Sequence, residues 1–290
     1  MSTPAIDNPR TYRLIEKALQ FCQDHHREQP PLEAIAAHVG LSPSHLQRLF
    51  TAWAGVSPKQ YLQFLTKEHA RECLKEASVL EASLASGLSS ASRLHDLLLT
   101  WEGVTPGERR SLGVGVRLRY GVFESPFGEY LLVATDKGIC KLAFLDSSDA
   151  LAEGLQDLQA DWPQAHVEAD PAALRALAAR IFTQPATPCE QPLPLYLRGS
   201  PFQRHVWQAL LSIPEGHLCS YQQLAYAAGQ PKAVRAVASA VAANPIGYLI
   251  PCHRVIRSTG HFGEYRWGSL RKQSLIGWEA GHILGARQEH

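Results

Sequence analysis

Two features are missing from this sequence, and each absence excludes a class of protein. No hydrophobic run is long enough to cross a bilayer, and residues 1–4 lack the basic-then-apolar pattern of a signal peptide. The six cysteines are scattered without any C-x-x-C spacing, which gives no sign of a disulfide framework or a zinc ribbon. We therefore expect a cytoplasmic protein with no membrane attachment and no metal site.

The sequence also has almost no net charge, +1 over 290 residues, but the charge is unevenly distributed. Residues 1–110 contain 12 basic and 12 acidic side chains, residues 111–200 contain 7 and 11, and residues 201–290 contain 9 and 4. A phosphate backbone would dock on the basic last third, although an ordinary solvated surface can carry the same surplus. The length suits two or three globular domains.

The first 110 residues have helical periodicity and contain a helix-turn-helix pattern. Residues 12–25 form an amphipathic stretch, and residues 32–50 follow it after two prolines. In the second stretch, Ala36 lets two helices cross closely, Gly40 suits the tight turn, and Leu46 seals the second helix onto the first. Ser42 is the expected N-cap, with a proline at the first helical position.

The same pattern returns about 47 residues later, which predicts a duplicated unit. Residues 87–90 echo residues 40–43, and residues 101–106 echo residues 53–58. Two such units joined by a helix resemble the AraC-type DNA-binding domain, in which two recognition helices enter successive major grooves. A helical bundle used only for protein contacts is the alternative. The candidate DNA contacts are Ser44, His45, Gln47 and Arg48 in the first unit and Arg93 in the second.

Residues 111–200 change to a strand-rich pattern. Residues 116–120 and 130–135 alternate, a turn follows at residues 136–138, and residues 140–145 form a third strand. Residues 149–158 and 171–182 are predicted helices, and a proline-rich loop leads out. We expect a small α/β scaffold lobe without catalytic residues.

A thiol and an imidazole are adjacent at Cys252 and His253, after Pro251. Such a cysteine is either a small buried hydrophobe or an activated nucleophile whose proton a histidine accepts. In an extended strand the two side chains would point to opposite faces. The second interpretation therefore requires that Pro251 ends a strand and that Cys252 lies at a turn or helix start, or that water carries the proton.

A third helix-turn-helix begins at Ser220, with Ala225 and Gly229 at the spacing of Ala36 and Gly40. Its second helix, residues 233–241, offers small side chains and one arginine, Arg235. Major-groove readout needs hydrogen-bonding side chains, whereas small residues let a helix lie close to a narrow groove. A buried alanine helix with Arg235 at its edge is the alternative.

The residues Pro251-Cys252-His253-Arg254 resemble the active-site motif of the methylated-DNA–protein-cysteine methyltransferases. Further matching segments lie at residues 202–207, 213–216, 220–221, 235–237, 244–245 and 265–268, followed by Lys272 and Glu279. The resemblance implies a ribonuclease H-like α/β lobe at residues 111–198 and a mostly helical, winged-helix-like catalytic lobe at 199–290. With the all-helical AraC-type domain at 1–110, the chain is predicted to be a multi-domain α and α/β protein.

The resemblance also implies roles for individual residues. Cys252 accepts the alkyl group once, His253 takes the thiol proton through water, and Glu279 holds His253. Asn244 orders the turn before the cysteine, and Tyr221 helps protonate the departing guanine. The implied DNA contacts are Ser220, Arg235 and Ala236, with Arg235 replacing the extruded base. The implied pocket residues are Val255, Tyr265, Arg266 and Trp267. No cofactor is implied.

The fusion of these parts resembles the Ada family of adaptive-response regulators, and we expect no counterpart of that family's four-cysteine zinc domain. Cys22, His25 and His26 share one predicted helix with nothing converging on them. The resemblance implies that the chain binds duplex DNA carrying O6-alkylguanine, with O4-methylthymine as a further substrate. It also implies promoter DNA and RNA polymerase as partners. We expect a bacterial monomer that is nucleoid-associated when it is bound to DNA. An activator signalled by Cys252 methylation and a cysteine hydrolase are the alternatives. Gly247 and Glu264 depart from the family pattern. Together with the bulky Arg266 and Trp267, they predict a narrow pocket that favours methyl over benzyl adducts.

Overall fold

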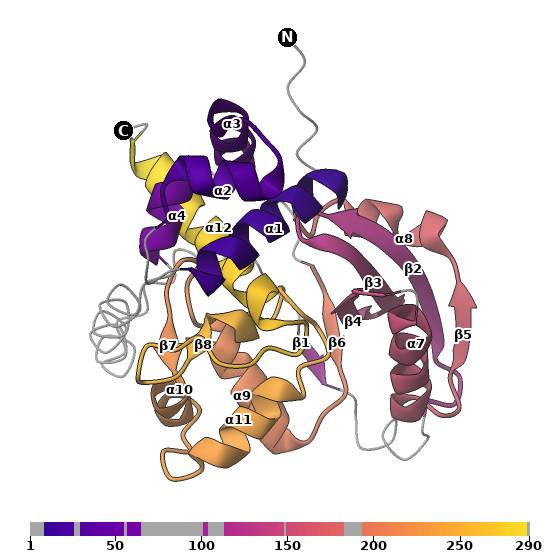
Figure 1. Cartoon of the computed structure of the whole chain (residues 1–290). Helices are drawn as coiled ribbons and strands as arrows, with labels where there is room; N and C mark the ends of the chain where they lie inside the picture. The colour runs from indigo at the N-terminus through magenta and orange to yellow at the C-terminus, as the bar shows by residue number, and fades with distance from the viewer. Residues whose placement is uncertain are drawn as a thin grey trace.

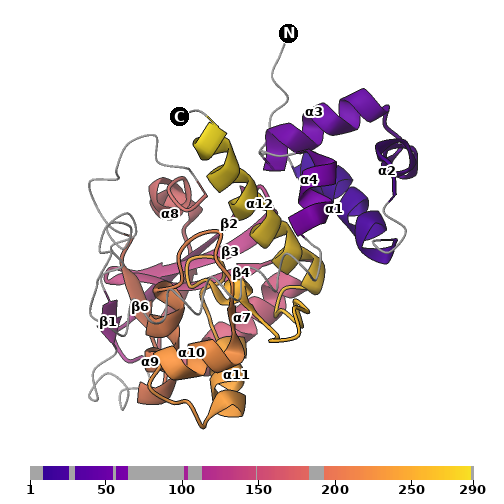
Figure 2. The same cartoon turned by 90° about the vertical axis from the view of Figure 1, so that its left-hand side faces the viewer.

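The computed structural model describes residues 9–25, 30–54, 57–64, 101–103, 113–147, 149–182 and 193–288. Three parts follow one another in it: a helical N-terminal part, a six-stranded sheet, and a mostly helical C-terminal lobe (Figure 1). The last helix, α12 (Ser269–Gln288), runs between the N-terminal helices and the rest of the molecule (Figures 1 and 2). The predicted sequence of domain types is confirmed for these ranges.

The N-terminal part contains α1 (Pro9–Asp24), α2 (Leu32–Val39), α3 (Pro43–Ala54) and α4 (Pro58–Phe64). Ala36 and Leu46 are fully buried between α2 and α3, and Gly40 has a φ of 77° in the turn. The Ser42 hydroxyl accepts a hydrogen bond from the backbone N–H of His45, as an N-cap does. The predicted helix-turn-helix is therefore confirmed. The repeated unit predicted around residues 87–106 lies outside the described residues, apart from residues 101–103.

The sheet has the strand order β1-β6-β4-β3-β2-β5. Its antiparallel centre is β2 (Arg117–Ser125), β3 (Gly128–Thr135) and β4 (Gly138–Phe144), close to the predicted strands. β5 (His166–Ala169) and β6 (Leu195–Leu197) add parallel pairings at the two sides. α7 (Ala150–Asp161) and α8 (Pro171–Ala178) are the two predicted helices.

The strand β1 (Trp101–Gly103) differs from the expectation that residues 1–110 are all helical. It pairs in parallel with β6, with Trp101 opposite Leu195 and Gly103 opposite Leu197. The physical reason is the unpaired edge of β6, whose backbone groups need partners that any extended segment can supply. Three residues of the N-terminal third therefore belong to the sheet of the next lobe.

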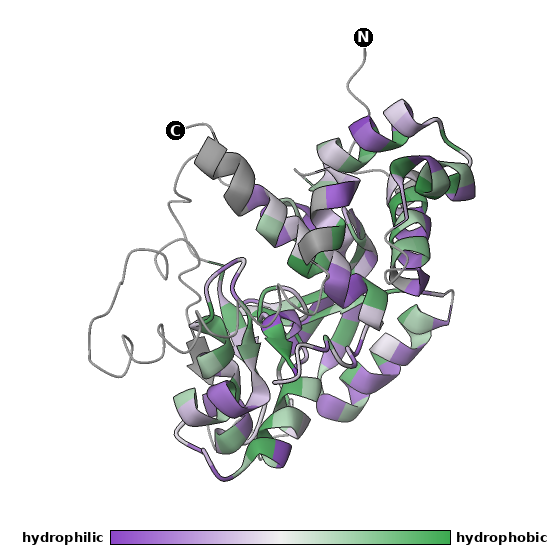
Figure 3. Cartoon of the chain, turned by 60° about the vertical axis from the view of Figure 1, so that its left-hand side comes forward, coloured by the Kyte–Doolittle hydropathy of each residue, from purple (hydrophilic) through white to green (hydrophobic). Residues whose placement is uncertain are grey.

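The two faces of the sheet are covered by different parts of the chain, because successive side chains of a strand point to opposite faces. On β3, Leu131 and Val133 pack with Leu158 of α7, whereas Tyr130 and Leu132 join the larger core shared with the C-terminal lobe. In Figure 3 the central strands are mostly hydrophobic, and the surrounding helices carry hydrophilic residues on part of their surface. The C-terminal lobe therefore packs against one face of the sheet, and α7 covers the other.

The C-terminal lobe holds α9 (Pro201–Leu211), α10 (Tyr221–Ala227) and α11 (Val234–Ala242), then a 3-10 turn η2 (Cys252–Arg254) before α12. Two short strands, β7 (Cys219–Ser220) and β8 (Val255–Ile256), pair in parallel beside it. The helices α9 and α10 both begin with a capping box, in which a serine and a glutamine exchange hydrogen bonds.

The N-terminal helices are attached to the rest of the protein by specific buried contacts. The Trp53 indole N–H donates to the carbonyl of Pro126 at 2.9 Å, and the Tyr61 hydroxyl donates to the carbonyl of Gln273 at 2.7 Å. A Cβ on Gly277 would lie 1.9 Å from the Tyr61 ring, so the glycine lets α4 approach α12. The helix-turn-helix unit is therefore seated on α12.

Candidate active site

The backbone at Cys252 and His253 forms a turn and not an extended strand. Pro251 has φ −78° and ψ 59°, and the chain then makes the 3-10 turn Cys252–Arg254. The requirement that the cysteine sits at a turn, derived from the sequence, is met. Both side chains are buried, Cys252 at 5% and His253 at 0% exposure. The site is thus shielded from bulk water.

Asn244 organises the turn that leads to the cysteine. Its buried amide NH2 donates to the carbonyls of Ile246 at 3.1 Å and Ile250 at 2.9 Å, and its oxygen accepts from the N–H of Ile246 at 3.0 Å. The same NH2 lies 3.1 Å from the sulfur of Cys252. Because an N–H donor stabilises the charged form of a thiol, Asn244 both shapes the turn and favours the thiolate.

Glu279 of α12 lies at the centre of a buried charged cluster. One carboxylate oxygen accepts from His253 Nε2 at 2.7 Å and from Arg254 at 2.8 Å, and the other accepts from Arg254 Nε at 2.9 Å. The backbone N–H of Gly216 donates to the second oxygen at 3.2 Å. Glu279 is therefore saturated with donors, and the predicted His253–Glu279 contact is present.

Electrostatics in this cluster favour a neutral imidazole beside a carboxylate. Burial opposes ionisation of Glu279, but Arg254 and His253 outweigh it and hold the pKa of Glu279 well below its usual range. Burial lowers the pKa of His253, and the attraction of Glu279 offsets only part of that effect. Nε2 therefore carries the proton given to Glu279. Nδ1 is buried with no hydrogen-bond partner among the described residues, so it is free to accept a proton.

The thiol itself is protonated at rest. Burial raises the pKa of Cys252, and the Asn244 hydrogen bond and the Lys272 charge offset this in part. Lys272 is itself almost fully buried, donates to the carbonyl of Val255 at 2.6 Å, and has its pKa lowered by burial to about 8. A buried cation next to the sulfur supports thiolate formation, but a base must still remove the proton.

Two tyrosines flank the sulfur from different segments. Tyr221, the first residue of α10, is half-buried, and burial followed by the Cys252 charge raises its pKa. Tyr265 feels the same charge, and its pKa is raised well above the usual value by burial first. Its hydroxyl is buried, and its interaction with the Cys252 thiol is a further cause of the shift. Both phenols therefore stay protonated at neutral pH and can donate.

The helix pair α10 and α11 has the predicted helix-turn-helix form. Ala225 is fully buried and Gly229 has a φ of 67° in the turn. Arg235 and Ala236 are exposed on α11, as the DNA-contact hypothesis requires. Ser220 differs from its predicted role in DNA contact. Its side chain is buried and its hydroxyl accepts from the N–H of Gln223, because a helix start needs that acceptor.

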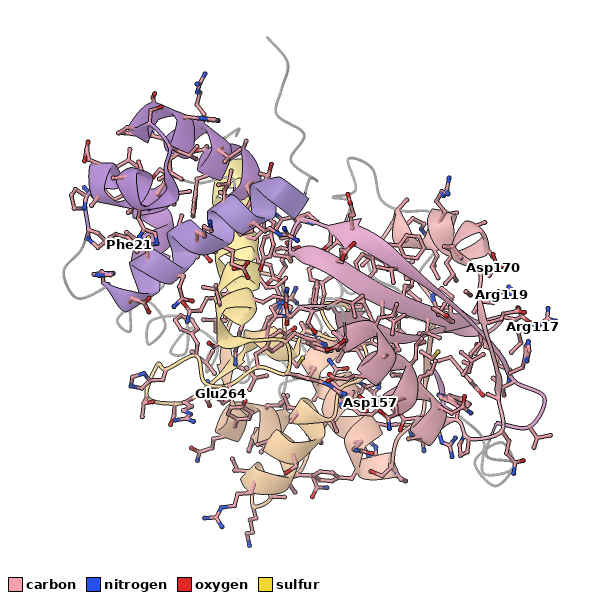
Figure 4. The ribbon with its side chains drawn as sticks, turned by 45° about the vertical axis from the view of Figure 1, so that its right-hand side comes forward. Phe21, Arg117, Arg119, Asp157, Asp170 and Glu264 are labelled. Carbon is pink, nitrogen blue, oxygen red and sulfur yellow. The ribbon has the colours of Figure 1, made fainter. Side chains whose placement is uncertain are left out.

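The pocket prediction needs a correction at Arg266. Its guanidinium donates to Asp157 of α7 at 2.8 Å and lines a separate cavity of about 490 Å³ between the two lobes. The carboxylate of Asp157 attracts the side chain across the lobe boundary, so the arginine does not narrow the thiol pocket. Glu264 is exposed on the loop before α12, and Asp157 lies on α7 (Figure 4).

Gly247 has a packing role that the sequence could not show. A Cβ there would meet the Trp267 ring at 2.8 Å and the Leu142 carbonyl at 3.3 Å. Trp267 is buried, with Phe144 at 6.0 Å and Tyr265 at 5.2 Å between ring centroids. The missing side chain at residue 247 is thus filled by the Trp267 indole.

Three residues that hold the site together had no role in the sequence analysis: the buried Lys272 and the partly buried Arg254 and Tyr248. Arg254 stood inside the recognised motif, and Lys272 precedes Glu279 by seven residues, two turns along α12. The predicted contacts Ser44, His45, Gln47 and Arg48 are all exposed on α3, away from this site, and Arg93 lies outside the described residues.

The described ranges contain neither a metal site nor a membrane-spanning helix. No group of three or more histidine, cysteine or acidic side chains there is arranged to hold a metal ion. No helix in those ranges is long and apolar enough to span a membrane.

Three family models match the chain, in the order in which its parts occur. They are a helix-turn-helix domain at residues 35–111, a 6-O-methylguanine DNA methyltransferase ribonuclease-like domain at 118–201, and the DNA binding domain of the same methyltransferases at 201–281. The last two matches begin and end close to the boundaries of the sheet lobe and of the lobe that contains Cys252.

Individual relatives are similar to all or to part of the chain. The bifunctional transcriptional activator/DNA repair enzyme Ada of Escherichia coli is 39% identical over 281 residues, which cover 96% of this chain and 78% of that protein. A methylated-DNA–protein-cysteine methyltransferase of Methanosarcina barkeri is 34% identical over 57% of this chain and 98% of its own length. A crystal structure of Mycobacterium tuberculosis OGT in complex with DNA has 32% identity, covers 57% of this chain and 93% of that one, and gives a TM-score of 0.43.

The sheet lobe, the buried Cys252 turn and the helix-turn-helix seated on α12 correspond to the three matched domains. The chain therefore belongs to the Ada family, in which an AraC-type helix-turn-helix domain is fused to a methylated-DNA–protein-cysteine methyltransferase.

Proposed function

We propose that the chain reverses O6-alkylguanine lesions in DNA, chiefly O6-methylguanine, by moving the alkyl group irreversibly to Cys252, once per molecule. The observation that carries this proposal is the buried pair of Glu279 and His253, 2.7 Å apart, next to the Cys252 turn. A carboxylate that holds an imidazole in one tautomer is the arrangement that activates a nucleophile through its proton.

The proton path begins at the thiol. Nδ1 of His253 has no partner in the part of the chain that the structure describes, and it takes the Cys252 proton through a water molecule. The resulting imidazolium is stabilised by Glu279, which stays ionised because Arg254 lowers its pKa. The thiolate is meanwhile stabilised by the amide of Asn244 and the charge of Lys272.

The transfer step is an in-line displacement. The Cys252 sulfur forms a bond to the methyl carbon while the bond from that carbon to guanine O6 breaks. The electron pair remains on the guanine, and Tyr221 supplies a proton to the departing base. The product thioether has no route back to a thiol, which is why each molecule reacts once.

The lesion must leave the base stack before the sulfur can reach it. The exposed Arg235 on α11 is suited to fill the gap, and the small residues around it let the helix approach a narrow groove at any sequence. The carbonyls of Cys252 and Val255 accept the amino group of the extruded guanine. Lys272 holds the second carbonyl in place through its 2.6 Å hydrogen bond.

The aromatic side chains near Cys252 support a preference for methyl over bulkier adducts. Trp267 fills the space beside Gly247, and Tyr265 stands against it, although Arg266 does not contribute. Comparing transfer rates from O6-methylguanine and O6-benzylguanine in the same duplex tests this preference. Equal rates for the two substrates would contradict it. O4-methylthymine is the further substrate to include in the series.

Incubation with a duplex carrying one O6-methylguanine, followed by peptide mass analysis, tests the main proposal. We expect one methyl group per protein on the Cys252 peptide, and none in Cys252→Ala. Cys140→Ala is the matched control, because Cys140 is equally buried but lies in β4 of the other lobe. Absence of transfer by folded protein that binds the duplex would overturn the proposal.

The helix-turn-helix unit on α12 assists DNA engagement in this proposal. Its exposed residues on α3 lie at the end of the molecule opposite α11 (Figures 1 and 2). A lesion bound at α11 would therefore leave α3 free for another stretch of DNA.

A second candidate function is transcription activation with Cys252 methylation as the signal. It is favoured by the direct packing of α3, the second helix of the first helix-turn-helix, on α12, the helix that carries Glu279. Footprinting on promoter DNA, with unmethylated and Cys252-methylated protein, separates the two functions. Protection that changes on methylation supports the activator, and identical patterns support a repair protein with an accessory DNA-binding domain.

A further inference from the structure

Tyr248 has an unusual backbone conformation four residues before Cys252. Its φ is 62°, and among the described residues it is the one side-chain-bearing residue with a positive φ. The N–H of Leu249 donates to the carbonyl of Gly247 at 2.7 Å, which closes a γ-turn around Tyr248. Turns of this hand are rare and strained, and glycine would adopt them without a steric penalty. The side chain of Tyr248 must therefore make contacts that offset the strain.

Those contacts lie against His253. The two rings are nearly parallel, with an angle of 9° between their planes and 6.2 Å between their centroids. The phenol ring is held from other directions by Phe182, at 4.6 Å, and by Trp278 of α12, at 6.3 Å. Tyr248 thus joins the strained turn, the sheet lobe and α12 beside the imidazole.

The imidazole needs such a neighbour because its own hydrogen bonding is incomplete. Nε2 is bound to Glu279, while Nδ1 has no partner among the described residues. One hydrogen bond fixes the position of a ring atom, but it does not stop the ring from turning about that bond. A flat, immobile ring parallel to the imidazole limits this rotation.

Tyr248 does not titrate in the range where the enzyme works. Burial is the main reason that the pKa of Tyr248 lies far above its usual value, and the charges of Glu279 and Glu215 raise it further. The phenol is therefore a neutral group that lies beside the buried charged cluster around Glu279. It also keeps water away from His253, whose lowered pKa depends on burial.

We propose that Tyr248 is a positioning residue for His253: its ring holds the plane of the imidazole so that Nδ1 stays available to the Cys252 proton. The residue acts through His253 and contacts neither the alkyl group nor the guanine. The strained turn is the consequence of placing an aromatic ring at a point where the backbone would favour glycine.

Three variants separate the ring from the turn, measured as single-turnover methyl transfer from an O6-methylguanine duplex between pH 5.5 and pH 9. Tyr248→Phe keeps both features and should react within about twofold of the wild type. Tyr248→Ala keeps the strain and loses the ring, and Tyr248→Gly loses both; each should be roughly tenfold slower at pH 7.

The pH profile provides the readout that a purely structural role would not change. Without the ring, water reaches His253 and its pKa rises toward the ordinary value, so the acid limb of the rate should move to higher pH in Tyr248→Ala and Tyr248→Gly. Tyr248→Leu, with bulk but no flat ring, should behave as Tyr248→Ala does and serves if the smaller variants fail to fold. A Tyr248→Gly variant with wild-type rate and acid limb would overturn the proposal, because the turn alone would then suffice. Wild-type behaviour of Tyr248→Ala or Tyr248→Leu would overturn it equally.

Discussion

The two helix-turn-helix units that the structure describes share one backbone design. In the first, the N–H of Leu41 donates to the carbonyl of Ala36 at 2.9 Å; in the second, the N–H of Gln230 donates to the carbonyl of Ala225 at 2.8 Å. Both alanines are fully buried where the helices cross. Each turn also contains a glycine with a positive φ. The scaffold is the same at both places.

Their outer surfaces differ. Helix α3 exposes side chains that can form hydrogen bonds with base edges, among them His45, Gln47 and Arg48. Helix α11 exposes Arg235 and small residues such as Ala236. A helix of the first kind is suited to reading sequence, and one of the second kind to close approach and base extrusion at any sequence. The motif therefore sets only the backbone geometry, and the exposed side chains of its second helix determine which kind of DNA contact it can make.

The largest expected difference between the two units should follow from replacing the arginine on the second helix of each. Arg235→Ala should slow methyl transfer in duplex DNA roughly 10²-fold, because the extruded base loses the side chain that replaces it in the stack. The rate with the free O6-methylguanine base should change little, since no extrusion is needed. Arg48→Ala is the matched control and should stay near the wild-type rate on a duplex. Equal losses in the two variants would mean that both helices serve the lesion.

The sequence predicted the parts of this comparison that depend on local spacing. Ala36, Gly40 and Leu46 identify the first turn by themselves, and the cysteine motif with Glu279 identifies the buried relay. Short strands were missed because β5 and β6 have three or four residues and no alternation to detect. Contacts between distant segments were also beyond reach: Trp53 with Pro126 spans 73 residues, and Tyr61 with Gln273 spans 212.

Side-chain direction explains the remaining differences. Arg266 has the same sequence neighbours whether it faces the thiol or Asp157, and only the packed lobes decide between them. The γ-turn at Tyr248 lies among packed aromatic rings, and a tyrosine at that position carries no sign of a positive φ in the sequence. Such features arise from tertiary packing rather than from local preference.

The next largest effect is a pH dependence, which should change methyl transfer at Cys252 but not DNA binding through α3. Lys272, beside Cys252, has a pKa of about 8 and supports the thiolate while it is charged. Because the pKa is lowered, that charge is present below pH 8 and is lost above it. Methyl transfer should fall roughly three- to tenfold between pH 7 and pH 9, and Lys272→Met should be slow and lack this step. Binding of undamaged DNA through α3 should show no transition at that pH. A rate that rises steadily to pH 9 would contradict the assignment.

A smaller effect should separate the two DNA contacts by salt. Arg48→Ala should weaken binding to undamaged duplex about fivefold and reduce the slope of log affinity against log salt by about one. Thr51→Ala is a suitable control, since Thr51 is exposed on the same helix but carries no charge. Unchanged affinity and slope in Arg48→Ala would show that α3 does not contact DNA.

The smallest expected effect tests the shared scaffold. Gly40 and Gly229 both have positive φ, and a Cβ at either position would meet nothing within 4 Å. The substitutions Gly40→Ala and Gly229→Ala should therefore cost only the strain of a left-handed alanine, about 1 kcal/mol each, in urea unfolding of the full chain. Neither variant removes a contact, so the two costs should agree. A much larger cost for Gly229→Ala would mean that the second turn is held more rigidly than the first. The two units would then differ in mechanics as well as in surface.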